Sequence, residues 1–148
     1  MYQKILLTLD GSELAGEAIE PAADVAATSG GHLVLLDIVP EHRGPFPFSI
    51  EAWRDAERHD AEEYLQEVKQ RLAAKVPDVD VVVAEGDKPG QTIVDVARRL
   101  GCDAVVMATH DRTGLRRMIQ GSVSSYVSQH MEGADVLLVR PGSTIAMR

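Results

Sequence analysis

Short apolar runs alternate along the chain with stretches in which apolar residues recur at helical spacing. Apolar runs of strand length cover residues 4–9, 33–39, 104–107 and 134–139, and residues 79–84 alternate in polarity as a strand near a sheet edge does. Enough residues separate successive runs for helical crossovers, and strands joined in that way pair in parallel. The pattern therefore predicts an α/β fold, a doubly wound domain whose five-stranded parallel sheet carries helices on both faces.

The first predicted helix follows the turn at Asp10-Gly11-Ser12. Ser12 has the side chain of a helix N-cap, and Ser29-Gly30-Gly31 ends the apolar stripe. Pro21 lies inside this helix and is expected to kink it, because proline lacks a backbone donor and its ring collides with the preceding turn.

Three further helices are predicted. A long one follows the proline-containing loop at residues 40–48, and its predicted buried face carries Trp53, Ala61, Tyr64, Leu65, Val68 and Leu72. Another begins after Gly86-Asp-Lys-Pro-Gly90 and stops at Gly101, and a short, serine-rich one covers residues 122–131.

Composition narrows the possible partners. The chain has 148 residues, 45% hydrophobic, without a linker or repeat, so residues 1–148 are expected to form a single domain. A net charge of −8 repels phosphate backbones and anionic lipid, and 4% aromatic residues offer few surfaces for base stacking. We therefore expect neither nucleic acid nor membrane as a partner. A single cysteine and the lack of a signal-peptide pattern predict a cytoplasmic protein.

The polar stretch after the fourth predicted strand has the features of an anion site. It closes with Gly121-Ser122 at the start of a helix, where free backbone N–H groups and the helix dipole favour negative charge. In open parallel sheets, ligands bind beyond the carboxyl ends of the strands, where strand order reverses. Asp10 follows the first strand, so a nucleotide could place its ribose at this carboxylate and its phosphates at the helix start.

Other sites are not indicated by the sequence. It contains neither the P-loop pattern nor Gly-x-Gly-x-x-Gly after the first strand. Its five histidines lack ligand spacing, so no metal site is expected, and His110 is interpreted as a loop residue. Because no residue pair forms a convincing nucleophile and base, we expect no enzyme, and slow nucleotide hydrolysis is only a third possibility.

Over nearly its whole length the chain resembles the universal stress protein family. The matching stretches are Lys4-Ile-Leu-Leu-Thr-Leu-Asp-Gly-Ser12, Gly86-Asp-Lys-Pro, Gly101-Cys-Asp-Ala-Val-Val-Met-Ala-Thr-His110, Gly114-Leu-Arg-Arg-Met-Ile-Gln-Gly-Ser-Val123 and Val136-Leu-Leu-Val-Arg140. The resemblance implies the strand order 3-2-1-4-5 and a role in stress response or regulation.

The nucleotide-binding branch of that family carries Gly, two residues, Gly, nine residues, then Gly-Ser or Gly-Thr. Here the spacing holds, but Ala108 and Asp111 replace the first two glycines before Gly121-Ser122. The resemblance implies ATP as ligand, with AMP and ADP as alternatives and Mg²⁺ as a companion. It assigns the ribose region to Asp10, adenine to Ile38 and Met107, and phosphates to the helix start. The residues so implicated are Leu9, Asp10, Ile38, Met107, Ala108, Asp111, Gly121, Ser122, Val123 and Ser124.

The replacements leave a second interpretation open. Like charges about 4 Å apart repel by roughly 1–4 kcal/mol, or roughly one to three decades of affinity, so Asp111 opposes a polyphosphate. Bound Mg²⁺, or a side chain turned to solvent, would remove most of that cost, and Arg112, Arg116 and Arg117 are close in sequence. The alternative is a dimeric interaction module that does not bind nucleotide. Asp10 could then serve only to cap its turn, and Gly121-Ser122 to begin a helix.

Pairing with a second copy is a separate expectation. In the family's strand order, the apolar run from Val136 to Val139 lies at the edge of the sheet. An exposed apolar edge needs cover, and antiparallel pairing with an identical strand supplies it. A homodimer through this strand is expected.

Overall fold

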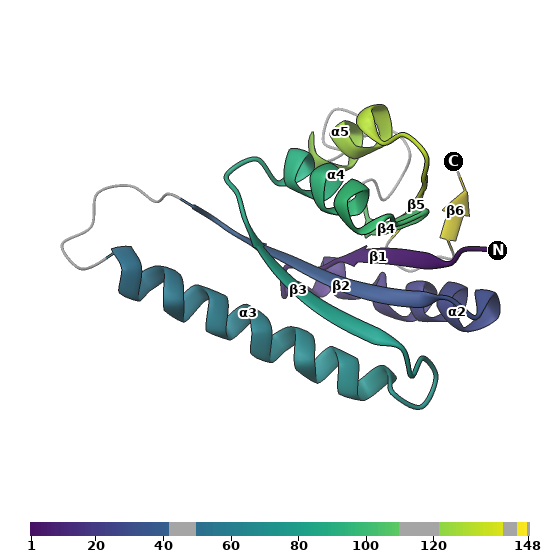
Figure 1. The fold of residues 1–148 in the computed structure, drawn as a ribbon, viewed down its shortest axis with the longest axis horizontal. Coiled ribbons are helices and arrows are strands. Elements are labelled where there is room, and N and C mark those ends of the chain that lie inside the picture. Colours follow the sequence, from purple (N-terminus) through teal and green to yellow (C-terminus); the bar gives the residue numbers. More distant parts are fainter. Residues whose placement is uncertain (42–49, 110–121, 141–144, 148) are drawn as a thin grey trace.

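A six-stranded sheet with the order β3-β2-β1-β4-β5-β6 forms the centre of the molecule (Figure 1). The structure is a computed structural model, and it describes residues 1–41, 50–109, 122–140 and 145–147. The strands are β1 (Lys4–Thr8), β2 (His32–Val39), β3 (Val79–Glu85), β4 (Ala104–Ala108), β5 (Asp135–Val139) and β6 (Ile145–Met147). The first five pair in parallel, which confirms the doubly wound α/β fold and the order 3-2-1-4-5.

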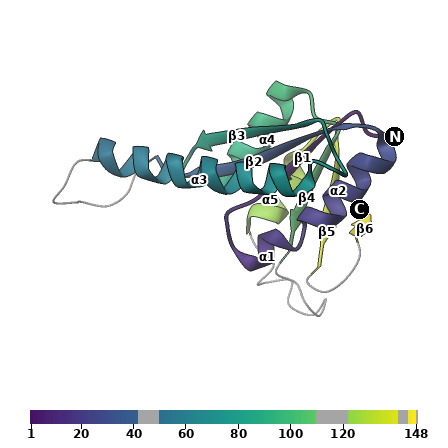
Figure 2. The same ribbon diagram turned by 90° about the horizontal axis from the view of Figure 1, so that it is seen from below.

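Helices cover both faces of the sheet. They are α1 (Glu13–Gly16), α2 (Ile19–Ser29), α3 (Ile50–Leu72), α4 (Pro89–Leu100) and α5 (Ser122–His130). The helices α2 and α3 pack on one face, while α4 and α5 pack on the other (Figures 1 and 2). Within the described part of the chain, no helix has the length and apolar character needed to cross a membrane.

Each central strand contributes to two separate cores. Ile5 and Leu7 of β1 face α2 and α3, and Leu6 between them faces α4 and α5. All three side chains are fully buried. Because successive side chains of a strand point to opposite faces, a strand covered on both sides must be apolar throughout. This is why unbroken apolar runs identified the inner strands, whereas the alternating run of β3 belongs to an edge strand.

The first predicted helix is broken rather than kinked. It consists of α1 and α2, and the break falls at Glu17 and Ala18, while Pro21 is the third residue of α2. In that first turn the missing N–H costs nothing, since the position has no helical acceptor. In a continuous helix, however, the ring of Pro21 would collide with the carbonyl of Glu17, four residues earlier. The helix α1 therefore ends there.

The outer edge of β5 is already paired within the chain. The strand β6 runs antiparallel to β5, with Leu137 opposite Met147, Leu138 opposite Ala146 and Val139 opposite Ile145. The prediction that the run from Val136 to Val139 forms the sheet edge is therefore wrong for this chain. Within this chain, Ile145–Met147 cover that edge.

Candidate functional site

A cleft of about 280 Å³ opens where β1, β2 and β4 end. The strand β1 pairs with β2 on one side and with β4 on the other, so the order of the strands reverses at β1. Such a reversal separates the neighbouring loops and leaves a crevice at the carboxyl ends of the strands. The cleft brings together these residues implicated by the sequence: Leu9, Asp10, Ile38, Met107, Ala108, Val123 and Ser124.

Asp10 forms a tight turn at the mouth of the cleft. Its Oδ1 atom accepts hydrogen bonds from the backbone N–H of Ser12 at 2.9 Å and from the Ser12 hydroxyl. Ser12 Oγ in turn accepts from the backbone N–H of Ala15 at 3.1 Å, which caps α1. Gly11 between them has φ +84°, which favours glycine.

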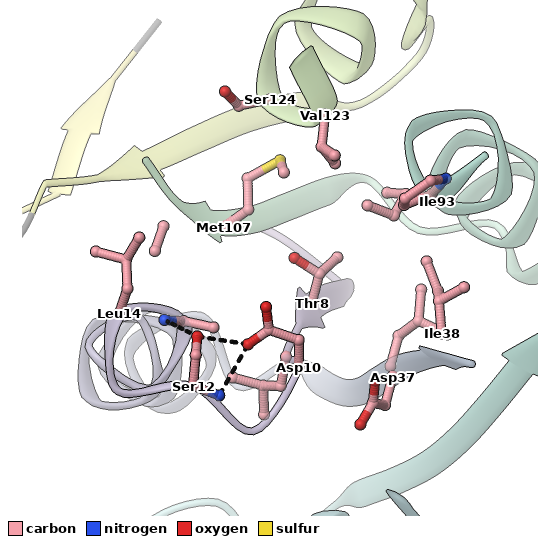
Figure 3. A pocket seen from close by; sticks show the side chains of 15 residues that line it. Thr8, Asp10, Ser12, Leu14, Asp37, Ile38, Ile93, Met107, Val123 and Ser124 are labelled. Atoms are coloured by element: carbon pink, nitrogen blue, oxygen red, sulfur yellow. Dashed lines mark hydrogen bonds between the residues drawn. The ribbon is translucent and has the colours of Figure 1, made fainter. Parts of the chain in front are cut away.

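Only one of the two carboxylate oxygens of Asp10 takes part in this turn. Figure 3 shows the second oxygen directed toward the cleft, between Thr8 and the helix that follows Ser12. Asp10 is exposed, so this oxygen can accept hydrogen bonds from a ligand. Capping and ligand binding are therefore compatible roles of one side chain.

An apolar wall faces Asp10 across the cleft. Ile38 of β2, Ile93 of α4, Met107 of β4 and Val123 of α5 point into the space between their elements (Figure 3). Met107 is 4% exposed and Ile93 is 2% exposed, so both are held by the core. Side chains of this kind make a flat, non-polar surface suited to an aromatic ring.

The helix α5 directs its first turn toward the same space. Val123 and Ser124 line the cleft, while Ser122 is exposed at the first position of the helix and is not part of the lining. The first four N–H groups of a helix lack helical partners and attract anions. The apolar wall and the helix start thus offer two different chemistries to one ligand.

Asp37 is a residue of the cleft that the sequence did not single out. It follows Leu36 on β2, lines the cleft and is 8% exposed. Burial raises the pKa of its carboxyl to about 6; the backbone N–H of Ile38 opposes the rise, and the carboxylates of Asp10 and Glu57 add to it. Figure 3 shows Asp37 and Ile38 pointing to opposite sides of the strand.

Some of the predicted loop lies outside the described residues. Asp111, Gly121 and His110 belong to this part, together with the arginines at 112, 116 and 117. Among the residues that are described, no group of three histidine, cysteine or acidic side chains is placed to hold a metal ion.

Ile93, Thr8 and Leu14 also line the cleft without having been predicted to do so. Ile93 lies on the buried face of α4, but its position beside the cleft depends on how α4 packs against the sheet. Spacing along one helix contains no information of that kind.

Comparison with known proteins gives consistent matches. Residues 1–140 match the universal stress protein family. A universal stress protein of Synechocystis sp. is 31% identical over 94% of this chain and 98% of its own length. One from Bacillus subtilis is 27% identical over 95% of this chain and all of its own.

Solved structures agree in fold. The universal stress protein UspA from Lactobacillus plantarum has a TM-score of 0.80 and 26% identity, covering 94% of this chain and 98% of that one. A universal stress protein solved in complex with cAMP has a TM-score of 0.68 and 24% identity, covering 94% and 97% of the two chains.

Proposed function

We propose that this chain, which belongs to the universal stress protein family, binds an adenine nucleotide in the cleft at the ends of β1, β2 and β4. ATP is the proposed ligand, with AMP and ADP as alternatives. The observation that carries the proposal is the convergence of three features on one space of about 280 Å³: the Asp10 carboxylate, an apolar wall and the start of α5. A structural neighbour solved with cAMP supports the ligand class.

Each part of a nucleotide has a suitable partner in the cleft. The adenine ring would lie against Ile38 and Met107, where burial of its flat faces supplies affinity. The ribose hydroxyls would donate to the free oxygen of Asp10. The phosphates would lie at the first turn of α5, near Ser122 and Ser124, where backbone N–H groups and the helix dipole stabilise negative charge.

We further propose a regulatory role in the cytoplasm for this binding. We propose that occupancy of the cleft, rather than turnover, is what the protein contributes to a stress response. The polar residues that line the cleft include Asp10, Asp37 and residues with hydroxyl groups. We propose no catalytic step for any of them. Mg²⁺ would accompany the phosphates as part of the ligand.

A dimeric interaction module without nucleotide is the second candidate. The observation that favours it is in the sequence, where Ala108 and Asp111 stand in place of two glycines of the nucleotide motif. Ala108 lines the cleft and adds a methyl group at the wall. On this alternative, ATP binding would appear only after both residues are changed to glycine.

Titration calorimetry separates the two candidates. Nucleotide-free protein is titrated with ATP, with and without Mg²⁺, beside the Ala108→Gly/Asp111→Gly variant. The proposal expects saturable heat from the unmodified chain and tighter binding by the variant. Heat from the variant alone would support the interaction module instead.

We also propose that two copies can pair through β5 to form a homodimer. The four residues after Asp135 are apolar and buried, and β5 already accepts an antiparallel strand on its outer side. Because β6 occupies that side, a second copy can pair there only where β6 has left the edge.

A further inference from the structure

The strand β3 forms the edge of the sheet opposite β6 (Figure 1). Among the described residues its one pairing partner is β2. In such a ladder, alternate residues direct both N–H and C=O to the neighbouring strand. The N–H of Gly86, just after β3, donates to the carbonyl of Val39 on β2, so the even-numbered residues of β3 face β2. Val81 and Val83 therefore direct their backbone groups to the outside of the sheet.

One side chain already uses this outer edge. Arg58 of α3 donates from Nη1 to the carbonyl of Val83 at 3.2 Å, and its Nη2 pairs with the carboxylate of Glu85. In the part of the chain that the structure describes, the N–H and C=O of Val81 and the N–H of Val83 have no partner. Open backbone groups on a strand edge are the groups that bind an extended chain.

The open edge borders a groove of about 550 Å³ between β3 and α4. The groove is lined by Val83 and Ala84 of β3 and, from α4, by Gln91, Asp95 and Arg99. These three side chains of α4 are exposed and recur every four residues, which places them about 6 Å apart along the helix axis. Alternate side chains of a strand are spaced by about 6.6 Å. A strand added to β3 would therefore set its alternate side chains against successive residues of α4.

Asp95 and Arg99 give the groove its charge pattern. They lie four positions apart on α4, yet no ion pair joins either one to a described residue, and both carry exposed charges. A basic side chain opposite Asp95 and an acidic one opposite Arg99 would satisfy both charges. The spacing of the two residues requires these side chains to be two positions apart in an extended ligand.

We propose that the edge of β3 binds an extended peptide segment that carries a basic and an acidic side chain two residues apart. Val81 and Val83 bind the peptide backbone as an added strand, while Asp95 and Arg99 select its side chains. Arg58 stays on the Val83 carbonyl and marks one end of the site. The proposal is independent of nucleotide binding, because the groove and the cleft share no described lining residue.

Fluorescence anisotropy with labelled, end-capped peptides tests the selection of side chains. The probe is Thr-Val-Lys-Val-Glu-Val-Thr, in which Lys and Glu lie on one face of a strand. Two matched peptides carry Lys or Glu at both positions. Each is titrated at about 0.15 M salt with the unmodified chain and with the Asp95→Arg and Arg99→Glu variants.

The unmodified chain should prefer the Lys–Glu peptide over both matched peptides by about threefold to tenfold. Asp95→Arg should instead prefer the Glu–Glu peptide, and Arg99→Glu the Lys–Lys peptide. A change of preference of this kind cannot result from a general loss of structure. The same preference in all three proteins would overturn the proposal.

Val81→Pro tests the backbone contact. This change removes an outward N–H but no bond to β2, so the sheet is retained and the added strand is lost. Val81→Ala is the matched control, because it also shortens the side chain but keeps the donor. Val81→Pro should weaken binding of the Lys–Glu peptide about tenfold relative to Val81→Ala. In the unmodified chain, the same peptide should protect the amides of Val81 and Val83 from hydrogen exchange.

Three further results would overturn the proposal. One is the lack of saturable binding at millimolar peptide, and another is protection of amides elsewhere in the chain in place of those of β3. The third is a dimer whose Val81 and Val83 amides are protected without peptide, because a second copy of the chain would then occupy the edge. None of these results bears on the nucleotide cleft, which calorimetry with ATP tests separately.

Discussion

Asp37 shows how a single buried side chain can make the stability of the fold depend on pH. The residue is buried, its carboxyl has Asp10 and Glu57 as charged neighbours, and it accepts a hydrogen bond from the N–H of Ile38. Each contact except the last favours the neutral acid. The native pKa of about 6 therefore exceeds the ordinary value of 3.8.

The raised pKa predicts that Asp37→Asn stabilises the fold at neutral and alkaline pH. The stabilising contribution of the neutral acid is complete below 3.8 and is lost as the pH rises through about 6. The free energy of unfolding of Asp37→Asn should therefore exceed that of the unmodified chain by about 1–3 kcal/mol at about pH 8, and match it at about pH 4. Urea denaturation at several pH values measures this, with exposed Asp95→Asn as control. A gain that is the same at every pH would contradict the account.

His32, at the other end of β2, also has a raised pKa, and its stabilising contribution is likewise lost as the pH rises. Its Nδ1 lies 2.8 Å from a carboxylate oxygen of Asp78, and its Nε2 lies 2.8 Å from one of Asp80. Burial alone would lower the pKa of His32, but the two carboxylates outweigh it and hold the pKa above 6.5. The stabilisation is full below 6.5 and is lost as the pH rises through the native pKa.

We therefore predict that His32→Gln destabilises the protein by about 1–2 kcal/mol at about pH 6 and much less at about pH 9. Thermal unfolding across this range checks the prediction. His59→Gln is the control, because His59 pairs with Glu63 on a largely exposed helix surface. If both variants lost the same stability at every pH, the contacts of His32 with Asp78 and Asp80 would not stabilise the protein.

Some residues of the cleft could be predicted from the sequence, and others could not. Asp10, Ile38, Met107 and Val123 were implicated by resemblance, and the structure brings them to one cleft. Asp37 was not, because a lone acid inside an apolar run gives no sign of which group it will face after the strands pair. The pKa of such a residue depends on tertiary neighbours.

At the scale of elements, the contact between α4 and α5 positions one side of the cleft. A Cβ atom built on Gly90 would lie 2.9 Å from Cβ of Tyr126, closer than real side chains approach. Tyr126 in turn stacks on His130, with ring centroids 3.9 Å apart. The first turn of α4 therefore packs directly on the middle of α5, and this requires glycine.

Gly90→Ala should destabilise the protein by about 1–3 kcal/mol, although alanine favours helices, because the overlap involves a Cβ atom that cannot rotate away. Displacement of α5 should also weaken ATP binding. Chemical denaturation and calorimetry measure the two effects, with Gln91→Ala at an exposed site of the same turn as control. An unchanged or raised stability would show that the two helices are not held at this distance.

The elements divide into those the sequence pattern determines and those it does not. The five parallel strands were predicted within a residue or two, because burial on two faces leaves a long apolar signal. The break between α1 and α2 was predicted as a kink, since the pattern of apolar residues continues across it. The three-residue strand β6 was missed, because its pairing depends on an edge that becomes available only in the folded sheet.

At the scale of the whole molecule, the proposed binding of an adenine nucleotide should change the stability of the domain. A ligand that binds only the native state stabilises it by mass action. ATP at about 100 times its dissociation constant should raise the melting temperature by roughly 5–10 °C for a domain of this size. Thermal shift with and without Mg²⁺ measures this, and Asp10→Ala should abolish it. A shift retained by that variant would place the ligand elsewhere.

The most direct test is the electron density of a crystal grown with ATP and Mg²⁺. The account predicts adenine against Ile38 and Met107, the ribose at the free oxygen of Asp10, and the phosphates at the first turn of α5. A cleft without nucleotide density at saturating ATP, or nucleotide bound at another place on the protein, would contradict it.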